Sequence, residues 1–496
     1  MSSALIHRIE TTLPPDPGRV IARLFLPGEE LPSGHSRTGA VAARVLALPE
    51  SDVERLAAQL VDDFSHRHHD YSTMLRAHAA IISPHLHDET PLSASRELLL
   101  GATFTAEYAV EAAALCNPSA VLHPDQTGLS AGQARIAVSL RGIGEGHLSS
   151  IGFVTAVVGP GPQWSFDPRD LPAVCGICSP ARWKQCHLRA VLAEHEQLDG
   201  LAETILAALP DEFTERELEL AFSEAPHDLL IRPGGQATLE LLRHVVTSAY
   251  EVTFPIDVEL NQQVLFPASA EEQNGLEDAR FVQFTGADGT GSYRATYTAY
   301  DGKQIAPRLL ISPDLRTFHA HRLAGPAAHN KGMALFPRLI AGQYLALCRS
   351  DGESTSVARS VDGFVWSEPE QIQAPEASWE LLQIGNCGSP IETDRGWLVL
   401  THGVGPMRKY SIGAILLDLT EPTQVLARLE EPLLRTAETE QEGYVPNVVY
   451  SCGGLIHDGR LWLPYGVGDA RIAVAWASLE DLLDAMVPVT RVNTVT

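Results

Sequence analysis

The seven residues SPDLRTF at 312–318 recur as SVDGFVW at 360–366, and this repeated stretch decides the fold. Each copy places an aspartate, Asp314 or Asp362, in a tight turn between a strand and an aromatic residue. Aspartate suits such turns because it hydrogen-bonds its own backbone, and Gly363 suits them because glycine tolerates positive φ. Radial repetition of such units shields strand edges that would otherwise template aggregation. Two copies therefore predict a repeated element of a β-propeller blade.

Five apolar, β-rich runs extend this pattern, and each leads to a polar residue at a turn. The runs cover residues 136–140, 295–300, 344–348, 397–401 and 461–465, and the polar residues are Arg141, Asp301, Arg349, His402 and Asp469. The last four recur at intervals of roughly fifty to seventy residues, close to the period of propellers and solenoids. Five copies predict a mainly β fold built as a five-bladed β-propeller. Because each unit places one polar side chain at the same point, we expect these side chains to converge on a shared axis and form a pocket.

Changes in composition along the chain predict four parts. They are a mostly helical N-terminal extension at 1–100, a first blade at 101–160, a helical insertion at 161–255 and the remaining blades at 256–496. The insertion has helical stripes at 180–209 and 212–250, and its length of roughly ninety residues is too great for a structureless loop. A lid over the pocket and an oligomer contact both remain open as its role.

Within the extension, the pattern predicts one or two short strands at about 19–47 and helices at 51–82. Ser51 is the expected N-cap of the first helix, with Glu54 at capping-box spacing. Residues 93–116 predict a further amphipathic helical stretch.

The charge balance limits the possible partners. Lys and Arg number 36 against 62 Asp and Glu, which gives a formal net charge of −26. Nucleic-acid binding is not expected, because it draws most of its affinity from basic side chains. An anionic substrate would need a local basic cluster that works against the field of the whole molecule. Arg141 and Arg349 at equivalent turns could supply one.

A chain of 496 residues with 45% hydrophobic content can bury an ample core. No apolar run approaches the length needed to span a membrane, so no membrane partner is expected. The first ten residues lack the basic start, apolar stretch and cleavage site of a secretory signal. We therefore expect a cytoplasmic location.

Seven cysteines, at 116, 175, 178, 186, 348, 387 and 452, form an odd set without a regular framework, which indicates reduced thiols. Cys175, Cys178, Cys186 and His187 could in principle bind zinc through three thiolates and an imidazole. The spacing to the second pair is unusually short. A free-thiol turn is the favoured interpretation, and no metal is predicted.

The densest motif is NGLEDAR at 274–280, which places two carboxylates and a guanidinium beside a strand start. Further motifs follow in the order TYTAYD at 296–301, NKGMALFP at 330–337, IGNCGSPI at 384–391, HGV at 402–404, the run 410–419 and GYVPNVVY at 443–450. Together they resemble glycoside hydrolase family 130, the β-mannoside phosphorylases and related mannosidases. The resemblance covers about 116–153 and 274–475, in the family's order.

The resemblance implies a five-bladed propeller with a sugar pocket at its centre. It also implies that phosphate attacks the anomeric carbon of a β-mannoside with inversion, releasing α-mannose 1-phosphate. Asp278 matches the acid of the family's Glu-Asp-Pro-Arg motif. An inverting site needs a proton donor for the departing oxygen and a nucleophile on the opposite face. The expected partners are a β-mannoside oligosaccharide and inorganic phosphate as co-substrate, with no cofactor. A homo-oligomer could form through the helical segments.

Two further sets of site residues follow from the same resemblance. The expected phosphate ligands are Arg141, Lys331 and Arg349, with His402 and Tyr410 near the same subsite. Arginine suits phosphate because its guanidinium donates as a fork, and lysine suits it as a point charge. The expected sugar ligands are Asn117, Ser150, Glu277, Arg280, Asp301 and Asp469.

The sequence departs from the family pattern at three positions. Ala279 replaces the proline of the acid motif, Ser389 replaces the first proline of a Pro-Pro-Ile motif, and Thr401 replaces the tyrosine before HGV. Two alternatives to phosphorolysis remain open. One is an inverting exo-β-mannosidase that uses water, and the other is a non-catalytic glycan-binding propeller. The linkage, the length of the mannoside and the acceptor sugar also remain open.

Overall fold

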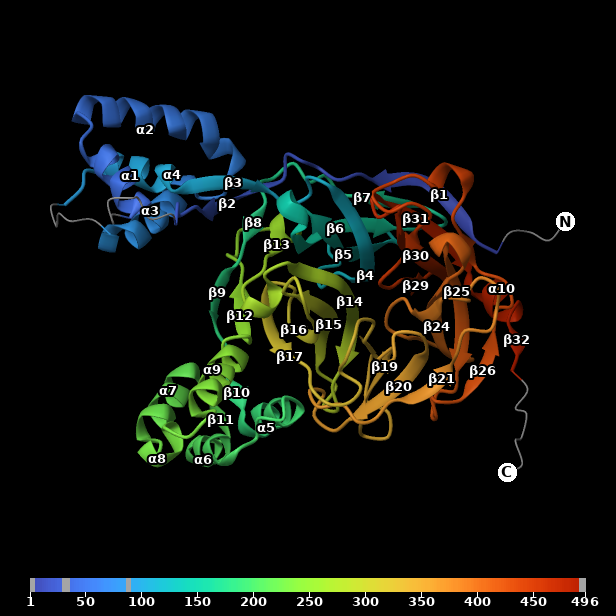
Figure 1. Cartoon of the computed structure of the whole chain (residues 1–496). Coiled ribbons are helices and arrows are strands. Elements are labelled where there is room, and N and C mark those ends of the chain that lie inside the picture. Colours follow the sequence, from blue (N-terminus) through green and yellow to red (C-terminus); the bar gives the residue numbers. More distant parts are fainter. Residues whose placement is uncertain (1–4, 29–35, 86–90, 490–496) are drawn as a thin grey trace.

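The computed structural model describes residues 5–28, 36–85 and 91–489. Residues 1–4, 29–35, 86–90 and 490–496 belong to the predicted extension and the predicted last blade, and they lie outside the described residues. The fold is mainly β, and two helical segments lie outside the sheets (Figure 1). No described helix has the length and apolar character that would let it cross a membrane.

Within the described residues, the strand pairings form five antiparallel units, numbered here in chain order. Unit 1 consists of β4 (Ala114–Leu122), β5 (Ala134–Ile143), β6 (Ser149–Val158) and β7 (Trp164–Phe166). Unit 2 consists of β14 (Gly275–Thr285), β15 (Gly291–Tyr300), β16 (Ile305–Ser312) and β17 (Thr317–Arg322). Unit 3 consists of β18 (Ala334–Leu335), β19 (Tyr344–Cys348), β20 (Thr355–Ser360) and β21 (Glu370–Gln373).

The last two units have a split first strand. In unit 4, both β22 (Gln383–Asn386) and β23 (Ile391–Thr393) pair with β24 (Gly396–Val404), which is followed by β25 (Tyr410–Leu417) and β26 (Val425–Arg428). In unit 5, both β28 (Val449–Tyr450) and β29 (Leu455–His457) pair with β30 (Arg460–Val467), which is followed by β31 (Arg471–Ser478). The outermost strand of unit 5 is β1 (His7–Leu13), from the other end of the chain.

The five predicted apolar runs all form strands, and each occupies the same place in its unit. They lie in β5, β15, β19, β24 and β30. The mainly β character predicted from them is therefore confirmed. Units 1 and 2 are joined through a parallel contact between β6 and β14, where Gly275 pairs with Ser149.

The repeated turns at 312–318 and 360–366 have the same hydrogen bonds. In both, the serine hydroxyl accepts from the backbone N–H three residues on, at 2.8 Å in the first turn and 2.9 Å in the second. The aspartate carboxylate then accepts from the N–H groups two and three residues on, at 2.8–2.9 Å. Leu315 and Gly363 take the same left-handed position, with φ of 58° and 80°. The sequence repeat is thus a structural repeat.

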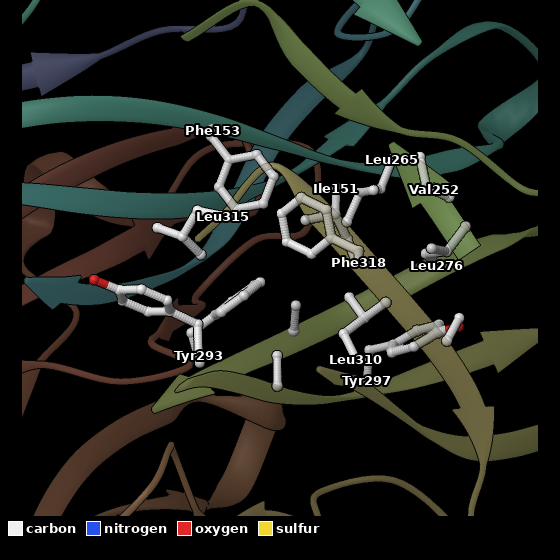
Figure 2. Close-up of a cluster of buried hydrophobic side chains, with 14 of the residues drawn as sticks. Ile151, Phe153, Val252, Leu265, Leu276, Tyr293, Tyr297, Leu310, Leu315 and Phe318 are labelled. Carbon is white, nitrogen blue, oxygen red and sulfur yellow. The ribbon is translucent and has the colours of Figure 1, made fainter. Parts of the chain in front are cut away.

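The core lies between the faces of neighbouring sheets. Figure 2 shows the cluster in which Ile151 and Phe153 of β6 pack against Leu276 of β14, Leu310 of β16 and Phe318 of β17. Burying side chains of this size contributes about 1.5–3 kcal/mol each. These contacts hold units 1 and 2 against each other and fix the strand ends that carry the site.

The N-terminal extension packs four helices beside a two-stranded sheet. The sheet pairs β2 (Val20–Leu24) with β3 (Thr105–Ala109), and the helices are α1 (Arg37–Leu46), α2 (Glu50–Phe64), α3 (Tyr71–Ile82) and α4 (Ala94–Thr103). Three predictions were wrong here. One short strand, β2, does form within 19–47, but residues 37–46 are helical. The predicted helix at 93–116 ends at Thr103 because β-branched and alternating residues continue as β3 and β4. Pro49, whose fixed φ suits a helix start, precedes α2, so Ser51 lies inside the first turn and caps nothing.

The insertion carries helices α5 (Gln185–Glu194), α6 (Gly200–Ala208), α7 (Glu215–Glu224), α8 (His227–Leu230) and α9 (Gly235–Val246). Its short strands are β8 (Val174–Cys175), β9 (Ile177–Pro180), β10 (Trp183–Lys184), β11 (Glu212–Phe213) and β12 (Tyr250–Thr253). β12 pairs with β17 on one side and with β9 on the other, so the insertion extends the sheet of unit 2. The remaining elements are β13 (Gln263–Leu265), β27 (Leu434–Arg435), α10 (Leu479–Asp484) and β32 (Val487–Pro488).

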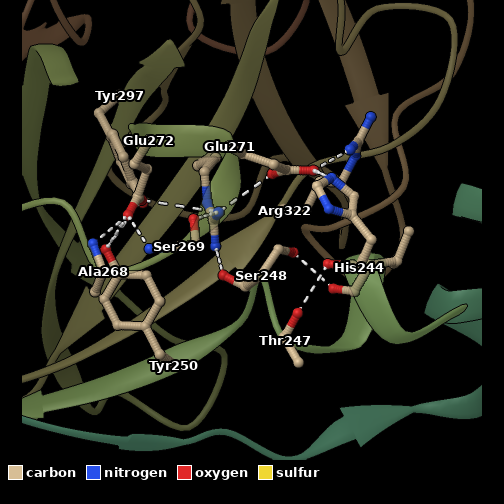
Figure 3. A network of polar contacts seen from close by, with 12 residues as sticks. His244, Thr247, Ser248, Tyr250, Ala268, Ser269, Glu271, Glu272, Tyr297 and Arg322 are labelled. Atoms are coloured by element: carbon tan, nitrogen blue, oxygen red, sulfur yellow. Dashed lines mark hydrogen bonds and ion pairs between the residues drawn. The ribbon is translucent and has the colours of Figure 1, made fainter. Parts of the chain in front are cut away.

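A buried polar network fastens the end of the insertion to unit 2 (Figure 3). Glu271 bridges two guanidinium groups, with Arg308 at 3.2 Å and Arg322 on its other oxygen. Glu272 accepts from the hydroxyl of Tyr250 at 2.9 Å and also from Tyr297. Buried charges are tolerated only when paired in this way. The network lies away from the cavity described below.

Candidate active site

All five units contribute side chains to one polar cavity of about 200 Å³. Its lining consists of Asn117, Arg141, Asp278, Lys331, Arg349, Gln383, His402, Arg408, Tyr410, Val445, Val448, Tyr450 and Asp469. Eight of these thirteen were expected site residues: Asn117, Arg141, Asp278, Lys331, Arg349, His402, Tyr410 and Asp469. Strand ends from distant parts of the sequence thus meet at one place.

Left-handed backbone positions turn three polar side chains toward the cavity. Asn117, Asp278 and Asp469 have φ of 50°, 56° and 48°. Asn117 lies where the β4–β5 register shifts, and Asp278 lies where the β14–β15 register shifts between Glu277 and Arg280. Such bulges re-aim a side chain and are common beside active sites. Asn and Asp tolerate this conformation better than most residues because their short polar side chains bond locally.

Arg141, at the end of β5, contacts both acids of the EDAR motif. Its Nη2 donates to Glu277 Oε1 at 2.6 Å, and its Nη1 donates to Asp278 Oδ1 at 3.3 Å. Its Nε donates to the hydroxyl of Ser149 at 3.0 Å. The Lys331 ammonium donates to the other oxygen of Glu277. Two cations and two carboxylates therefore form one connected cluster.

Arg280 supports Asp278 on the side away from the cavity. It is 2% exposed, and its guanidinium donates to the Cys387 carbonyl, the Asp278 carbonyl and the Tyr450 hydroxyl, each at 2.9 Å. With its donors directed to these groups, Arg280 holds the backbone of Asp278 in place. It does not line the cavity as the predicted sugar ligand would.

His402 and Arg349 form the opposite wall. Arg349 Nη1 lies 3.1 Å from His402 Nε2, and the imidazole packs against the rings of Tyr410 and Tyr450. Burial, together with the charges of Arg349 and Arg280, lowers the pKa of His402 well below its ordinary value. His402 is therefore neutral at physiological pH, and its Nε2 accepts a hydrogen bond from Arg349.

The two carboxylates in the cavity differ in proton affinity. Burial alone would raise the pKa of Asp278, but Arg141, Arg280, Lys331 and Arg349 hold it below its ordinary value. Burial raises the pKa of Asp469 to about 6, and the charge of Asp278 adds to this rise. Carboxylates whose environments separate their pKa values in this way can take different acid–base roles.

Four expected site residues do not line the cavity. Asp301 lies in an exposed turn, where its carboxylate accepts from the N–H groups of Lys303 and Gln304 at 2.7 and 2.6 Å. The expected convergence therefore fails in unit 2, because Asp301 caps its own turn and Asp278 supplies the carboxylate instead. Ser150 is 2% exposed and pairs with Gly142 in the β5–β6 ladder, while its neighbour Ser149 contacts Arg141. Glu277 and Arg280 stand behind the lining residues.

Sequence reasoning missed Gln383, Arg408, Val445, Val448 and Tyr450. For Arg408 a signal exists, because the β24–β25 loop repeats the backbone of the β5–β6 loop. Gly144 and Gly405 have φ, ψ of −99°, −159° and −102°, −165°, and His147 and Arg408 have φ of 63° and 52°. An alignment of the RG pair at 141–142 with the HG pair at 402–403 brings Arg408 to the position equivalent to His147. Arg408 lines the cavity.

The possible zinc ligands do not come together. Cys175, Cys178 and Cys186 are exposed free thiols. His187 is buried, and its ring packs between those of Trp183 and Phe364, with centroids 4.9 and 5.1 Å away. Among the described residues, no group of three or more His, Cys, Asp or Glu side chains could hold a metal ion.

Comparison with known proteins gives consistent matches, of which the following are examples. A family model described as beta-1,4-mannooligosaccharide phosphorylase matches residues 240–487. The 1,2-beta-oligomannan phosphorylase of Thermoanaerobacter sp. strain X514 is 34% identical over 232 residues, covering 45% of this chain and 75% of that protein. The Beta-1,4-mannooligosaccharide phosphorylase of Ruminococcus albus is 34% identical over 183 residues, covering 34% of this chain and 54% of that protein.

One solved structure among those similar to this chain is the Beta-1,2-Mannobiose phosphorylase from Listeria innocua, in complex with beta-1,2-mannobiose. It aligns with a TM-score of 0.45 and 22% identity, over 76% of this chain and 93% of that chain.

Proposed function

The chain belongs to glycoside hydrolase family 130, and we propose that it is a β-mannoside phosphorylase. It cleaves manno-oligosaccharides with inorganic phosphate and inverts the anomeric carbon, so that the products are α-mannose 1-phosphate and a shortened sugar. The observation that carries the proposal is one carboxylate, Asp278, that lines the same polar cavity as Arg141, Lys331 and Arg349.

In this reaction Asp278 supplies the proton for the departing glycosidic oxygen. In the free enzyme the surrounding cations favour its ionised form. Phosphate brings negative charge among the same cations, and a nearby like charge disfavours a carboxylate anion. Phosphate binding therefore raises the pKa of Asp278 and loads the proton that cleavage consumes.

Phosphate attacks the anomeric carbon on the face opposite the departing oxygen. It needs no second carboxylate as a base, because it is already an anion. Arg141, Lys331 and Arg349 hold it through charge-assisted hydrogen bonds, which are shorter and stronger than neutral ones. His402 and Tyr410 line the cavity beside Arg349 and complete the phosphate-binding site. No cofactor takes part.

One observation favours a second candidate, the inverting β-mannosidase. Asp469 is a second carboxylate in the cavity, and its pKa is raised to about 6. A base with a pKa near the working pH suits the activation of water. The four cations of the lining, Arg141, Lys331, Arg349 and Arg408, favour phosphate over water as the nucleophile.

We also propose an architecture and a cellular location for the enzyme. The five units form a five-bladed propeller with the cavity at its axis, since one strand end or loop from each unit reaches the lining. Apart from β1, which pairs with unit 5, and β7, which pairs with unit 1, the described residues of the extension at 1–100 and of the insertion at 161–255 lie outside the blades at 101–160 and 256–496. The enzyme acts in the cytoplasm.

The test is incubation of the purified chain with β-1,2- and β-1,4-mannobiose, with and without inorganic phosphate. Sugar phosphate should appear only when phosphate is present, and the better substrate assigns the linkage. Release of free mannose at the same rate without phosphate would identify a hydrolase. Binding of mannobiose without turnover in either condition would identify a glycan-binding propeller.

A further inference from the structure

Glu277 stands next to the proposed acid, and two cations of the cavity converge on it. One carboxylate oxygen accepts from Arg141 at 2.6 Å, and the other accepts from Lys331. Glu277 is 6% exposed and does not line the cavity. Both of its oxygens are therefore directed toward protein cations.

We infer that Glu277 is a positioning residue that holds Arg141 and Lys331 together as a pair for phosphate, and that it does not bind the sugar. The inference rests on the proposed phosphorolysis. It assigns Glu277 a role different from the sugar contact that the family resemblance implies.

The local backbone explains how two adjacent acids reach the same guanidinium. Neighbouring residues of a regular strand point to opposite faces of the sheet. Here the ladder is regular at Glu277, which pairs with Thr298, and shifts immediately after it. Asp278 at φ 56° turns its side chain back toward Arg141. The bulge thus lets Glu277 anchor the guanidinium while Asp278 faces the cavity.

The anchoring leaves Arg141 able to bind an anion. An arginine side chain carries five N–H donors. Nε contacts Ser149, and Nη1 and Nη2 each make one contact, to Asp278 and Glu277. Two N–H groups remain on a guanidinium whose plane is fixed by three acceptors. A fixed fork loses less freedom when it binds phosphate.

Lys331 requires this anchor more than Arg141 does. It comes from the segment before β18 in unit 3, whereas Arg141 comes from unit 1, and the lysine side chain is 35% exposed. Within the described residues, the Lys331 ammonium group hydrogen-bonds Glu277 alone. A flexible ammonium group near another cation is held in place here by the shared carboxylate.

The test is Glu277→Gln in the full chain, with steady-state kinetics varied separately in phosphate and in mannobiose. We expect kcat/KM for phosphate to fall at least tenfold, while the KM for mannobiose stays within twofold of the wild type. A larger rise in the KM for mannobiose than for phosphate would overturn the inference, because it would mark Glu277 as a sugar ligand. Tighter phosphate binding by the variant would also overturn the inference, since Glu277 would then only reduce the positive charge of the phosphate site.

Glu271→Gln is the matched control. Glu271 is 7% exposed and also bridges two cations, Arg308 and Arg322, but it lies in the network of Figure 3 and outside the cavity. We expect any loss in its kcat/KM to be equal for phosphate and mannobiose. If Glu277→Gln shows the same parallel loss as Glu271→Gln, the role of Glu277 is structural and the inference fails.

A second variant, Glu277→Asp, and calorimetric titration with phosphate test the role of Glu277 independently. Glu277→Asp retains the charge but shortens the reach, so it should raise the KM for phosphate even if the Gln variant fails to fold. An unchanged KM for phosphate in Glu277→Asp would overturn the inference. Calorimetric titration with inorganic phosphate needs no turnover. If the wild type proves to be a hydrolase, the proposed function fails, but weaker phosphate binding by Glu277→Gln still supports the anchor and equal binding refutes it.

Discussion

Three polar residues around the cavity, Asn117, Asp278 and Asp469, share a left-handed backbone conformation. Strain of this kind concentrates at functional sites, where the surrounding fold holds it in place. Asparagine accepts the same conformation, so exchange between Asp and Asn changes charge and proton chemistry while it preserves the backbone. The Asp→Asn variants of the site therefore test the charge and proton chemistry of a single residue without a change of backbone.

Asp278→Asn should lower turnover by at least about a thousandfold, because the amide cannot supply the proton that the leaving oxygen needs. The KM for mannobiose should change far less. Initial rates of sugar phosphate release, with circular dichroism to verify the fold, measure both effects. Turnover equal to that of the wild type would remove Asp278 from the role of acid.

Asp469 makes stability depend on pH. Its pKa in the folded protein is about 6, above the ordinary 3.8, so its contribution to stability is complete below about pH 3.8 and is lost as the pH rises through 6. The difference corresponds to about 3 kcal/mol, as an upper estimate. Urea unfolding at pH 4.5 and 7.5 should therefore show a smaller pH-dependent loss for Asp469→Asn than for the wild type.

Asp278 acts in the opposite direction and does not interfere with this measurement. Its pKa in the folded protein lies below the ordinary 3.8, so its contribution is present above that pH and is lost only in stronger acid. Identical slopes for Asp469→Asn and the wild type between pH 4.5 and 7.5 would show that Asp469 is not the group that titrates.

At the scale of the element, the repeated Ser–Asp turns fix the ends of β16 and β20. Asp362→Ala removes an acceptor for two backbone N–H groups, which should lower the free energy of unfolding by about 1–3 kcal/mol. The hydrogen bonds of Asp362 stay within its own turn and reach no residue that lines the cavity, so kcat should stay within twofold. Chemical denaturation measures the loss. Asp314→Ala, in the equivalent turn, should show a loss of similar size.

The elements could be predicted from the sequence where short-range rules decide them. The runs before Arg141, Arg349 and His402 are apolar and β-rich and lead to a polar residue at a turn, and all form strands. The failures came where another part of the chain decides. Asp301 follows such a run but bonds its own turn, whereas Asp278 reaches the cavity through a bulge that no local pattern announces.

The site was predictable to the extent that motif residues mark it. The cations Arg141, Lys331 and Arg349 follow from the family motifs, and all three line the cavity. Arg408 was missed although its loop repeats the β5–β6 loop, whereas Tyr450 was missed because its proximity depends on how units 4 and 5 pack against unit 1. The anchoring contacts of Glu277 likewise depend on side chains from two other units, which spacing along one strand cannot show.

At the scale of the whole molecule, the strongly negative chain surrounds a cavity lined by cations. The formal net charge is −26, yet Arg141, Lys331, Arg349 and Arg408 gather at one site. Such local concentration lets the protein hold an anion against the overall field and still stay soluble. The carboxylates of Glu277 and Asp278 offset the repulsion between two of these cations, Arg141 and Lys331.

The N-terminal strand completes the last unit, which gives a prediction about the whole fold. Deletion of residues 1–13 would remove β1 and expose the edge of β31. We expect a large loss of thermal stability and a tendency to aggregate, because an exposed strand edge pairs with other chains. Arg8→Ala is the control. It removes the hydrogen bonds of Arg8 to Glu440 and to the Arg435 carbonyl but keeps β1, so a deletion no more damaging than Arg8→Ala would contradict the prediction.

Pairing β1 with β31 also sets an order of events during synthesis. His7 is synthesised long before its partner Trp476. Contacts so distant in sequence form slowly because a long loop must close first. We expect β1 to stay unpaired in the nascent chain until β31 has been synthesised, and chaperones that cover exposed strands to act during that interval.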